Sequence, residues 1–429
     1  MRIERVHAWE VLDSRGVPTV ACAIALDGGA EGVATVPAGA STGSHEAHEL
    51  RDGDARYAGK GVRSAVTAVN GEIARAIRNA NAAEQEAIDW QLRELDGTPT
   101  LERLGANAVL AASVACALAA AAGRGLPLWR VLEPERPPLL PLPMINIFSG
   151  GAHAGGLVDL QDVLVVPVGA TTFSEALEWA SRVRAATAEV LRERAHGTAL
   201  VADEGGLAAR LHSNREAVEV VTLGIERCGL IPGVDAAIAI DVAATQLVDG
   251  DSYRLSSESR SATASELVDE LRTWCDDFSI LSIEDPLGED DASGWQLASE
   301  RLADIQLLGD DLFVTSPDRL DAGIAEGIAN AVLVKPNQIG TLSDARHVVE
   351  IARNAGYATV LSARSGETED AWLADLAVGW RTGQLKVGST MRSERTAKWN
   401  RLLRIEAEQT DATFAGRSVL GGVKSQAVM

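Results

Sequence analysis

The feature that most constrains the fold is a series of short apolar runs that each end abruptly at a charged residue. Residues 305–309 form one such run before Asp310, and residues 331–334 form another before Lys335. A turn and a helical pattern lie between them, which predicts a strand–helix–strand unit. Parallel α/β folds carry their chemistry at the carboxyl ends of the strands. We therefore expect Asp310 and Lys335 to lie in one shared pocket at these strand ends, which we call the mouth.

The same pattern recurs through the second half of the chain. Further apolar runs end at Asp241, at Glu284, at residues 362–365 and at Lys386. The steps from 241 to 284, 310 and 335 are 43, 26 and 25 residues, enough for a helical crossover each time. Two surface charges would explain one such unit but not the series. The sequence therefore predicts an α/β fold with a parallel sheet and a charged mouth.

The first half of the chain has a different pattern. Residues 2–36 indicate a meander of short strands, and helical patterns follow from 61 to about 132, with the strongest at 101–122. Five prolines between 134 and 143 indicate a domain boundary. We predict an N-terminal α+β domain over residues 1–135 and a second domain over 140–429 that carries the site.

Composition limits the partners. The net charge of −22 argues against nucleic acid or an anionic membrane as a main partner. The four cysteines form no C-x-x-C motif, which favours buried reduced thiols. The N-terminus lacks the apolar segment of a signal peptide, and the most apolar stretch, 106–123, is expected to be too short to cross a bilayer. We therefore expect a soluble cytoplasmic protein.

The residues at the strand ends permit a particular chemistry. Asp241, Glu284 and Asp310 offer hard oxygen ligands with no histidine or cysteine beside them, which favours Mg²⁺ or Mn²⁺ over zinc. Lys335 and Lys386 follow on later strands. An ammonium beside a divalent ion and a second ammonium should have a lowered pKa, so one of these lysines could act as a base.

Other polar residues complete this site. Arg364 and Ser365 could hold a phosphate through charge-assisted hydrogen bonds. Glu204 and Asp162 are acids on earlier strands, and one of them could protonate a departing hydroxyl. His153 lies in a glycine-rich loop, where a merely solvated histidine is the simpler interpretation. Together these residues suggest an acid/base elimination of water from a small phosphorylated carboxylate.

The motifs at these positions resemble those of the enolase family over nearly the whole chain. The similar segments follow one another in order, and they are Asp13-Ser14-Arg15-Gly16, Gly39-Ala40-Ser41-Thr42-Gly43, Glu49-Leu50-Arg51-Asp52-Gly53-Asp54, His153-Ala154-Gly155-Gly156, Asp203-Glu204-Gly205-Gly206, Ser282-Ile283-Glu284-Asp285-Pro286, Lys335-Pro336-Asn337-Gln338, Arg364-Ser365-Gly366-Glu367 and Arg392-Ser393-Glu394-Arg395.

The resemblance implies an N-terminal α+β domain, then an eight-stranded β/α barrel of TIM type that opens with antiparallel elements. It implies two Mg²⁺ ions, the second brought with the substrate, and a homodimer or higher homo-oligomer. Each candidate residue then acquires an implied role. These are the metal ligands Asp241, Glu284 and Asp310, with Ser41 for the second ion; the base Lys335; the acid Glu204; Lys386 at the substrate carboxylate; Arg364 and Ser365 at the phosphate; His153 on a loop near the phosphate; and the pair Gln161 and Asp162.

Several positions depart from the family pattern. Asp162 stands where glutamate is usual, which shortens the side chain by about 1.5 Å. Ala363 replaces a histidine, and Ser149 replaces an asparagine. Asp162 and Ala363 both remove side-chain volume from the expected substrate pocket, whereas the expected ligands, base and acid are intact.

These departures leave the substrate open. One reading is dehydration of 2-phosphoglycerate to phosphoenolpyruvate. A second is a paralogue of the carboxyphosphonoenolpyruvate synthase type, from phosphonate or phosphinate biosynthesis, whose substrate carries a larger phosphoryl group beside Ala363. A third is a non-catalytic binding protein built on the same frame. Intact ligands and base argue against the third reading, and an inability to bind Mg²⁺ would favour it.

Overall fold

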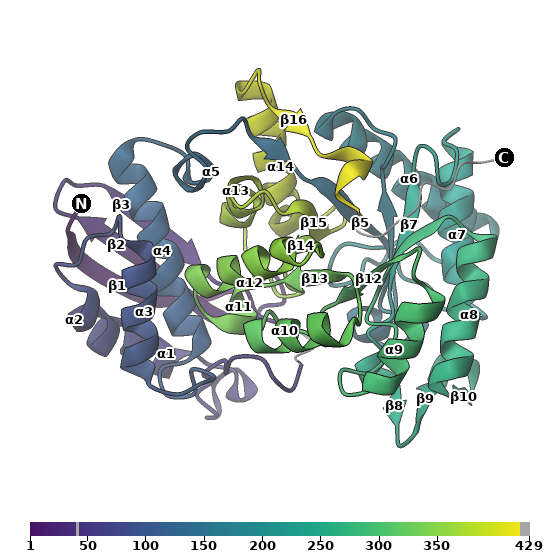
Figure 1. The fold of residues 1–429 in the computed structure, drawn as a ribbon, viewed down its shortest axis with the longest axis horizontal. Helices are drawn as coiled ribbons and strands as arrows, with labels where there is room; N and C mark the ends of the chain where they lie inside the picture. The colour runs from purple at the N-terminus through teal and green to yellow at the C-terminus, as the bar shows by residue number, and fades with distance from the viewer. Residues whose placement is uncertain (40–42, 421–429) are drawn as a thin grey trace.

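The computed structural model of the chain describes residues 1–39 and 43–420. It consists of an N-terminal α+β domain followed by a closed eight-stranded barrel wrapped in helices. Figure 1 shows the purple and blue N-terminal domain on one side and the barrel with its teal and green helices on the other. The predicted fold class is confirmed. We propose that the domains divide in the proline-rich segment, with the N-terminal domain over residues 1–135 and the barrel domain over residues 140–429.

A three-stranded antiparallel sheet and a layer of helices form the N-terminal domain. Strands β1 (Ile3–Leu12), β2 (Pro18–Leu26) and β3 (Glu31–Thr35) pair in that order. The helices are α1 (Arg63–Ala68), α2 (Ala74–Ile77), α3 (Gln85–Asp96), α4 (Ala106–Arg124) and α5 (Leu128–Leu132). Helix α4 packs so closely on β3 that a Cβ added at Gly32 would lie 2.1 Å from the backbone nitrogen of Ala119.

Helix α4 corrects one expectation. In the described part of the chain it is the one helix with the length and apolar composition to cross a membrane. Its 19 residues overturn the argument that the segment is too short, because the helix continues to Arg124. Burial explains its composition instead, since 83% of its apolar window lies inside the protein. It is a core helix, which can be apolar on all sides.

The barrel closes in the order β11-β12-β13-β14-β15-β5-β6-β7. Its strands are β5 (Leu142–Ser149), β6 (Asp162–Val166), β7 (Ala237–Asp241), β11 (Ile280–Glu284), β12 (Gln306–Gly309), β13 (Ala331–Val334), β14 (Ala358–Ser362) and β15 (Gly383–Gly388). Strand β6 is antiparallel to both neighbours, and the other pairs are parallel. The implied antiparallel start of the barrel is confirmed.

Helices cover the outside of the barrel, and a small three-stranded sheet and a two-stranded sheet are added to it. The helices are α6 (Phe173–Glu193), α7 (Asn214–Arg227), α8 (Ala264–Asp277), α9 (Ala292–Arg301), α10 (Pro317–Glu326), α11 (Pro336–Ile339), α12 (Leu342–Asn354), α13 (Trp372–Gly379) and α14 (Ser393–Glu408). The small strands are β8 (Val248–Asp249), β9 (Ser252–Leu255) and β10 (Arg260–Ala262), and β4 (Leu139–Leu140) with β16 (Thr413–Phe414).

The direction of β6 decides which residues meet at the mouth. In the ladder, Asp162 at the start of β6 lies opposite Asp241 at the end of β7 and opposite Ser149 at the end of β5. The barrel interior below this level is filled by apolar side chains such as Leu164, Leu308 and Leu333. The fold therefore gathers charged side chains at one end of a packed barrel.

Candidate active site

Three carboxylates lie at the ends of neighbouring strands. Asp241 ends β7, Glu284 ends β11 and Asp310 follows β12, and their exposed fractions are 1%, 2% and 7%. The loop after each strand contains a non-glycine residue with positive φ, namely Ala243, Asp285 and Thr315. Such backbone strain is typical of functional sites, where the surrounding structure holds the chain in place.

Two lysines reach these carboxylates. Lys386, on β15, places Nζ 2.7 Å from Oδ2 of Asp241 and 2.7 Å from Oε2 of Glu284. Lys335, which follows β13, donates a hydrogen bond from Nζ to Oδ2 of Asp310. The prediction that Asp310 and Lys335 share one mouth is confirmed.

The two lysines have pKa values set by their carboxylate neighbours, and the lowered pKa that we expect beside a divalent ion stays a prediction. Burial lowers the pKa of Lys335, but Asp310 and Glu284 raise it, and the net pKa is raised. Burial likewise lowers the pKa of Lys386, and Asp241 and Glu284 raise it well above its usual value. Both ammonium groups are thus paired directly with carboxylates, which favours their charged forms. A lysine base would need Asp310 to be engaged elsewhere.

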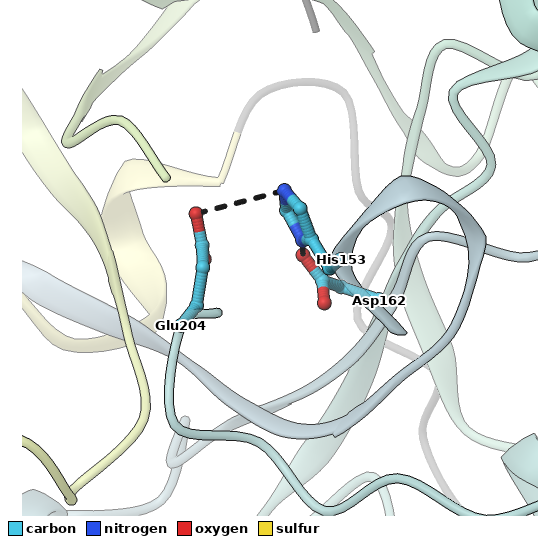
Figure 2. A group of neighbouring side chains, drawn as sticks. All are labelled: His153, Asp162 and Glu204. Carbon is cyan, nitrogen blue, oxygen red and sulfur yellow. Dashed lines mark hydrogen bonds and ion pairs between the residues drawn. The ribbon is translucent and has the colours of Figure 1, made fainter. Parts of the chain in front are cut away.

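A second cluster lies across the mouth and consists of His153, Asp162 and Glu204 (Figure 2). The Nδ1 atom of His153 lies 3.0 Å from Oδ2 of Asp162, and its Nε2 atom lies 3.9 Å from Oε1 of Glu204. All three side chains are buried. His153 is therefore a fixed group between two acids, and the simpler reading of a solvated loop histidine is wrong.

Charge within this cluster shifts the pKa values. Burial lowers the pKa of His153, but Asp162 and Glu204 together raise it to about 9. Burial raises the pKa of Glu204. The positive charges of His153, Arg395 and the two lysines together have a larger, opposite effect, so the net pKa is lowered. Burial raises the pKa of Asp162. This arrangement pairs a protonated imidazole with an ionised Glu204.

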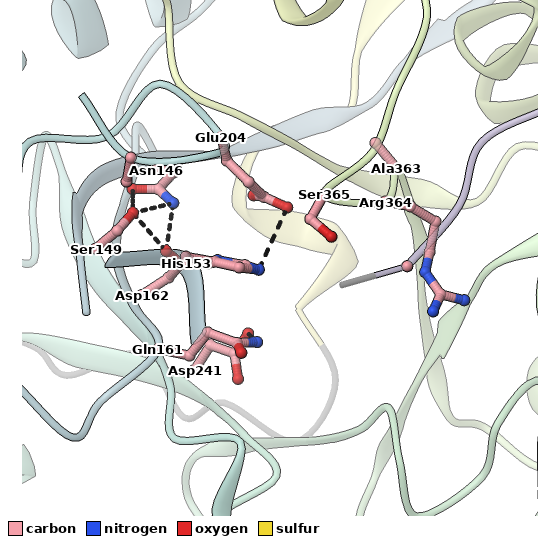
Figure 3. A network of polar contacts seen from close by, with 12 residues as sticks. Asn146, Ser149, His153, Gln161, Asp162, Glu204, Asp241, Ala363, Arg364 and Ser365 are labelled. Carbon is pink, nitrogen blue, oxygen red and sulfur yellow. Dashed lines mark hydrogen bonds and ion pairs between the residues drawn. The ribbon is translucent and has the colours of Figure 1, made fainter. Parts of the chain in front are cut away.

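The candidate phosphate-binding residues Arg364 and Ser365 lie at the mouth, directly after β14 (Figure 3). Arg364 donates from one guanidinium nitrogen to Oε2 of Glu46 at 2.9 Å, and from another to Oε1 at 3.2 Å. Glu46 comes from the N-terminal domain. Arg395, which is fully buried on α14, donates to the backbone carbonyls of Arg364 and Ser365. The N-terminal domain and α14 thus jointly fix this segment.

A cavity of about 20 Å³ joins these groups, which is room for about one water molecule. Its lining residues are His153, Gln161, Glu204, Asp241, Lys335, Ser362, Ala363, Arg364, Ser365 and Lys386. A second cavity of about 310 Å³ also reaches Arg364, and Glu46 and Glu49 lie in its wall. Nine of the thirteen candidate residues from the sequence therefore line one space, and Glu284, Asp310 and Asp162 are not part of its lining.

Two candidates need separate mention. Gln161 donates from Nε2 to Oδ2 of Asp241 at 3.1 Å, so it touches a candidate ligand. Ser41 lies outside the residues that the structure describes.

The sequence did not single out several residues that support the site. Asp285 accepts the backbone N–H groups of Asp310 and Asp311 at 3.0 and 2.7 Å, and Gln338 donates to Oδ1 of Asp310 at 2.9 Å. Asn146 donates to Asp162. Asn146 is a polar residue inside an apolar strand, and this feature of the sequence could have indicated its role in the site.

Within residues 1–39 and 43–420, two groups of acidic or histidine side chains have ligand atoms within 4.8 Å of one another. One is His153, Asp162 and Glu204, and the other is Asp285, Asp310 and Asp311. The predicted trio of Asp241, Glu284 and Asp310 is not gathered to that distance, because the Lys386 ammonium lies between Asp241 and Glu284. Asp310 is the one predicted ligand that belongs to a close group.

A capping α+β domain, a barrel with one reversed strand, and a mouth of carboxylates and lysines define an enolase-type β/α barrel protein. The family model described as "Enolase, N-terminal domain" matches residues 3–132, and that described as "Enolase, C-terminal TIM barrel domain" matches residues 137–422. The chain belongs to the enolase family.

Proposed function

We propose that the chain is a Mg²⁺-dependent hydro-lyase that removes water from 2-phosphoglycerate or a closely related substrate. The observation that carries this proposal is the pairing of Lys335 with Asp310, next to Lys386 between Asp241 and Glu284. It puts a base candidate and the candidate ligands of a hard divalent ion side by side in one buried mouth.

The residues fit a hard divalent cation. Asp241, Glu284 and Asp310 offer only carboxylate oxygens, and burial together with the charges of Asp241 and Asp310 raises the pKa of Glu284 well above its usual value. These carboxylates repel one another, and a divalent ion held by them would relieve that repulsion. When bound, the ion would supply electrostatic stabilisation of negative charge that develops on the substrate carboxylate. Ser41 is the proposed ligand for a second ion.

The protein side chains divide the remaining work. Lys335 takes the proton from C2, and this requires a neutral amine that is not paired with Asp310. Asp310 would be released from that pairing if it held the metal ion. Lys386 holds the substrate carboxylate. Arg364 and Ser365 hold the phosphate, for which Arg364 must exchange its contact with Glu46 for the phosphate oxygens.

The hydroxyl at C3 leaves as water, which requires a proton. The cluster of His153, Asp162 and Glu204 supplies that proton. Glu204 is the proposed acid, but its lowered pKa keeps it ionised in this arrangement. His153 has the proton to give, since its pKa is raised to about 9, and its Nε2 atom lies 3.9 Å from Glu204. We therefore assign proton delivery to His153 and Glu204 together.

A second candidate function rests on Ala363. This residue lines the mouth beside Arg364. A histidine is usual at its position, and the smaller alanine would leave more room for a larger phosphoryl group. A carboxyphosphonoenolpyruvate synthase activity would use that space. The carboxylates of Glu46 and Glu49 in the adjoining cavity oppose a more anionic head group. We therefore favour 2-phosphoglycerate.

The experiment compares kcat/KM for 2-phosphoglycerate with kcat/KM for its carboxyphosphono analogue, with and without Mg²⁺. The proposal predicts Mg²⁺-dependent formation of an enol phosphate from 2-phosphoglycerate and no preference for the analogue. A preference for the analogue would establish the second candidate. Absence of turnover with both, together with no Mg²⁺ binding, would favour a non-catalytic binding protein. We further propose a cytoplasmic homodimer or higher homo-oligomer.

A further inference from the structure

Asp162 is separated from the mouth that it was expected to line. It is fully buried, with an exposed fraction of 0%, and the described residues around the mouth cavity do not include it. His153 stands in that lining instead. Because Asp162 lies behind that lining, it can act on a substrate only through its neighbours.

The two oxygens of Asp162 have different partners. Ser149 donates from Oγ to Oδ1 at 2.8 Å, and Asn146 donates from Nδ2 to the same oxygen. Oδ2 faces Nδ1 of His153 at 3.0 Å. Because a carboxylate only accepts hydrogen bonds, Nδ1 carries a proton, and the ring is turned so that Nε2 points to Glu204 (Figures 2 and 3).

Packing confines the two donors of Oδ1. A Cβ added at Gly206 would lie 2.3 Å from Oδ1 of Asn146 and 2.6 Å from Oγ of Ser149. Asn146 also donates to Ser149 at 3.0 Å, so the pair is joined. Both residues come from β5, whose end lies opposite Asp162 in the ladder. The strand and Gly206 therefore hold this pair firmly.

We propose that Ser149 and Asn146 are positioning residues that hold Asp162 behind His153, so that Asp162 orients His153 and does not itself contact the substrate. This inference rests on the proposed function and refines it. The shorter aspartate and the serine act as a matched pair, since the short carboxylate stays within reach of the short hydroxyl. The reacting group on this side of the mouth is then His153 with Glu204.

A double-mutant cycle in the full-length protein tests this inference. The variants are Asp162→Asn, His153→Gln and both together, assayed with 2-phosphoglycerate and Mg²⁺. If Asp162 acts through His153, Asp162→Asn lowers kcat about tenfold in the wild type and less than about twofold in the His153→Gln background, with KM little changed. An equal loss in both backgrounds would overturn the inference, because it would mean that Asp162 acts directly.

Ser149→Ala tests the positioning pair, with Ser113→Ala as the matched control. Both serines have an exposed fraction of 0%, and Ser113 lies on α4 in the N-terminal domain. We expect Ser149→Ala to lower kcat about tenfold and Ser113→Ala to leave it within about twofold. Equal effects of the two variants would contradict the proposal.

A spectroscopic measurement separates this inference from the proposed function. In protein with ¹⁵N-labelled histidine, the His153 Nδ1 resonance should shift in Ser149→Ala and in Asp162→Asn but not in Ser113→Ala. This measurement needs no turnover, so it stands even if 2-phosphoglycerate is not the substrate. An unchanged His153 resonance in Ser149→Ala would overturn the positioning role.

Discussion

The ammonium of Lys386 lies 2.7 Å from Oδ2 of Asp241, although 145 residues separate the two in the chain. Asp241 ends β7 and Lys386 lies within β15, on opposite sides of β5 and β6 in the barrel. The contact spans the mouth and, with Glu284, makes one buried cluster of charge.

Replacing Lys386 should lower the free energy of unfolding, because two buried carboxylates lose their cation. Lys386→Met leaves Asp241 and Glu284 buried without their cation, and breaking such a pair destabilises a protein by about 3–5 kcal/mol. Added Mg²⁺ should restore more stability to the variant than to the wild type, because it replaces the lost positive charge. Chemical denaturation with and without MgCl₂ measures both effects. Lys60→Met, at an exposed site, is the control. A loss below about 1 kcal/mol would contradict the burial of this charge pair.

The raised pKa of His153 predicts how stability depends on pH. The folded pKa of about 9 lies above the ordinary value of 6.5, so the charged ring stabilises the folded state. That contribution is complete below pH 6.5 and is lost as the pH rises through 9. The difference in free energy of unfolding between wild type and His153→Gln should be larger at about pH 6 than at about pH 10, by on the order of 3 kcal/mol.

Urea denaturation of both proteins across this range measures the gap, and the same substitution at the exposed His347 is the control. A gap that widened with rising pH would show that His153 is buried as a neutral ring.

Filling the space at Ala363 should change substrate preference. Ala363 has an exposed fraction of 5% and lines the mouth beside Arg364. Ala363→His adds volume and a polar ring, so we expect the ratio of kcat/KM for 2-phosphoglycerate to that for its carboxyphosphono analogue to rise about tenfold. Steady-state assays of both substrates measure that ratio. An unchanged ratio would mean that residue 363 does not limit the phosphoryl group.

A prediction away from the site tests the packing of α4 on β3. A Cβ at Gly32 would meet the backbone of Ala119 at 2.1 Å, so Gly32→Ala should destabilise the protein by about 3 kcal/mol. Gly28→Ala is the matched control, because nothing lies within 4 Å of its added Cβ. Thermal unfolding compares the two, and equal melting temperatures would contradict this packing.

Most strand ends were predictable from the sequence because these buried parallel strands are apolar runs that stop at a charge. The predicted end at Lys386 is wrong, since β15 continues through Lys386 to Gly388. The runs before Asp310 and Lys335 end as predicted, at Gly309 and Val334. The direction of β6 followed only from the resemblance to a known family. Nothing in the apolar pattern of residues 162–166 distinguishes an antiparallel strand from a parallel one.

The side-chain partners were not predictable, because they depend on distances in the folded protein. The spacing of residues along the sequence does not give those distances. The sequence placed His153 on a loop but could not show that Asp162 lies behind it, 3.0 Å away. It presented Arg364 as a phosphate residue but not its pairing with Glu46, 318 residues away in the chain. Such contacts arise only when the N-terminal domain and the barrel are packed together.

The most direct test of the central claim is the turnover of 2-phosphoglycerate with Mg²⁺ by wild type and by Lys335→Ala. If Lys335 is the base, wild type forms phosphoenolpyruvate, and the variant loses kcat by at least about 100-fold while it stays folded. Circular dichroism confirms folding, and the ultraviolet absorbance of the enol phosphate measures the rate. Near-equal turnover by the two proteins would contradict the claim that Lys335 removes the C2 proton.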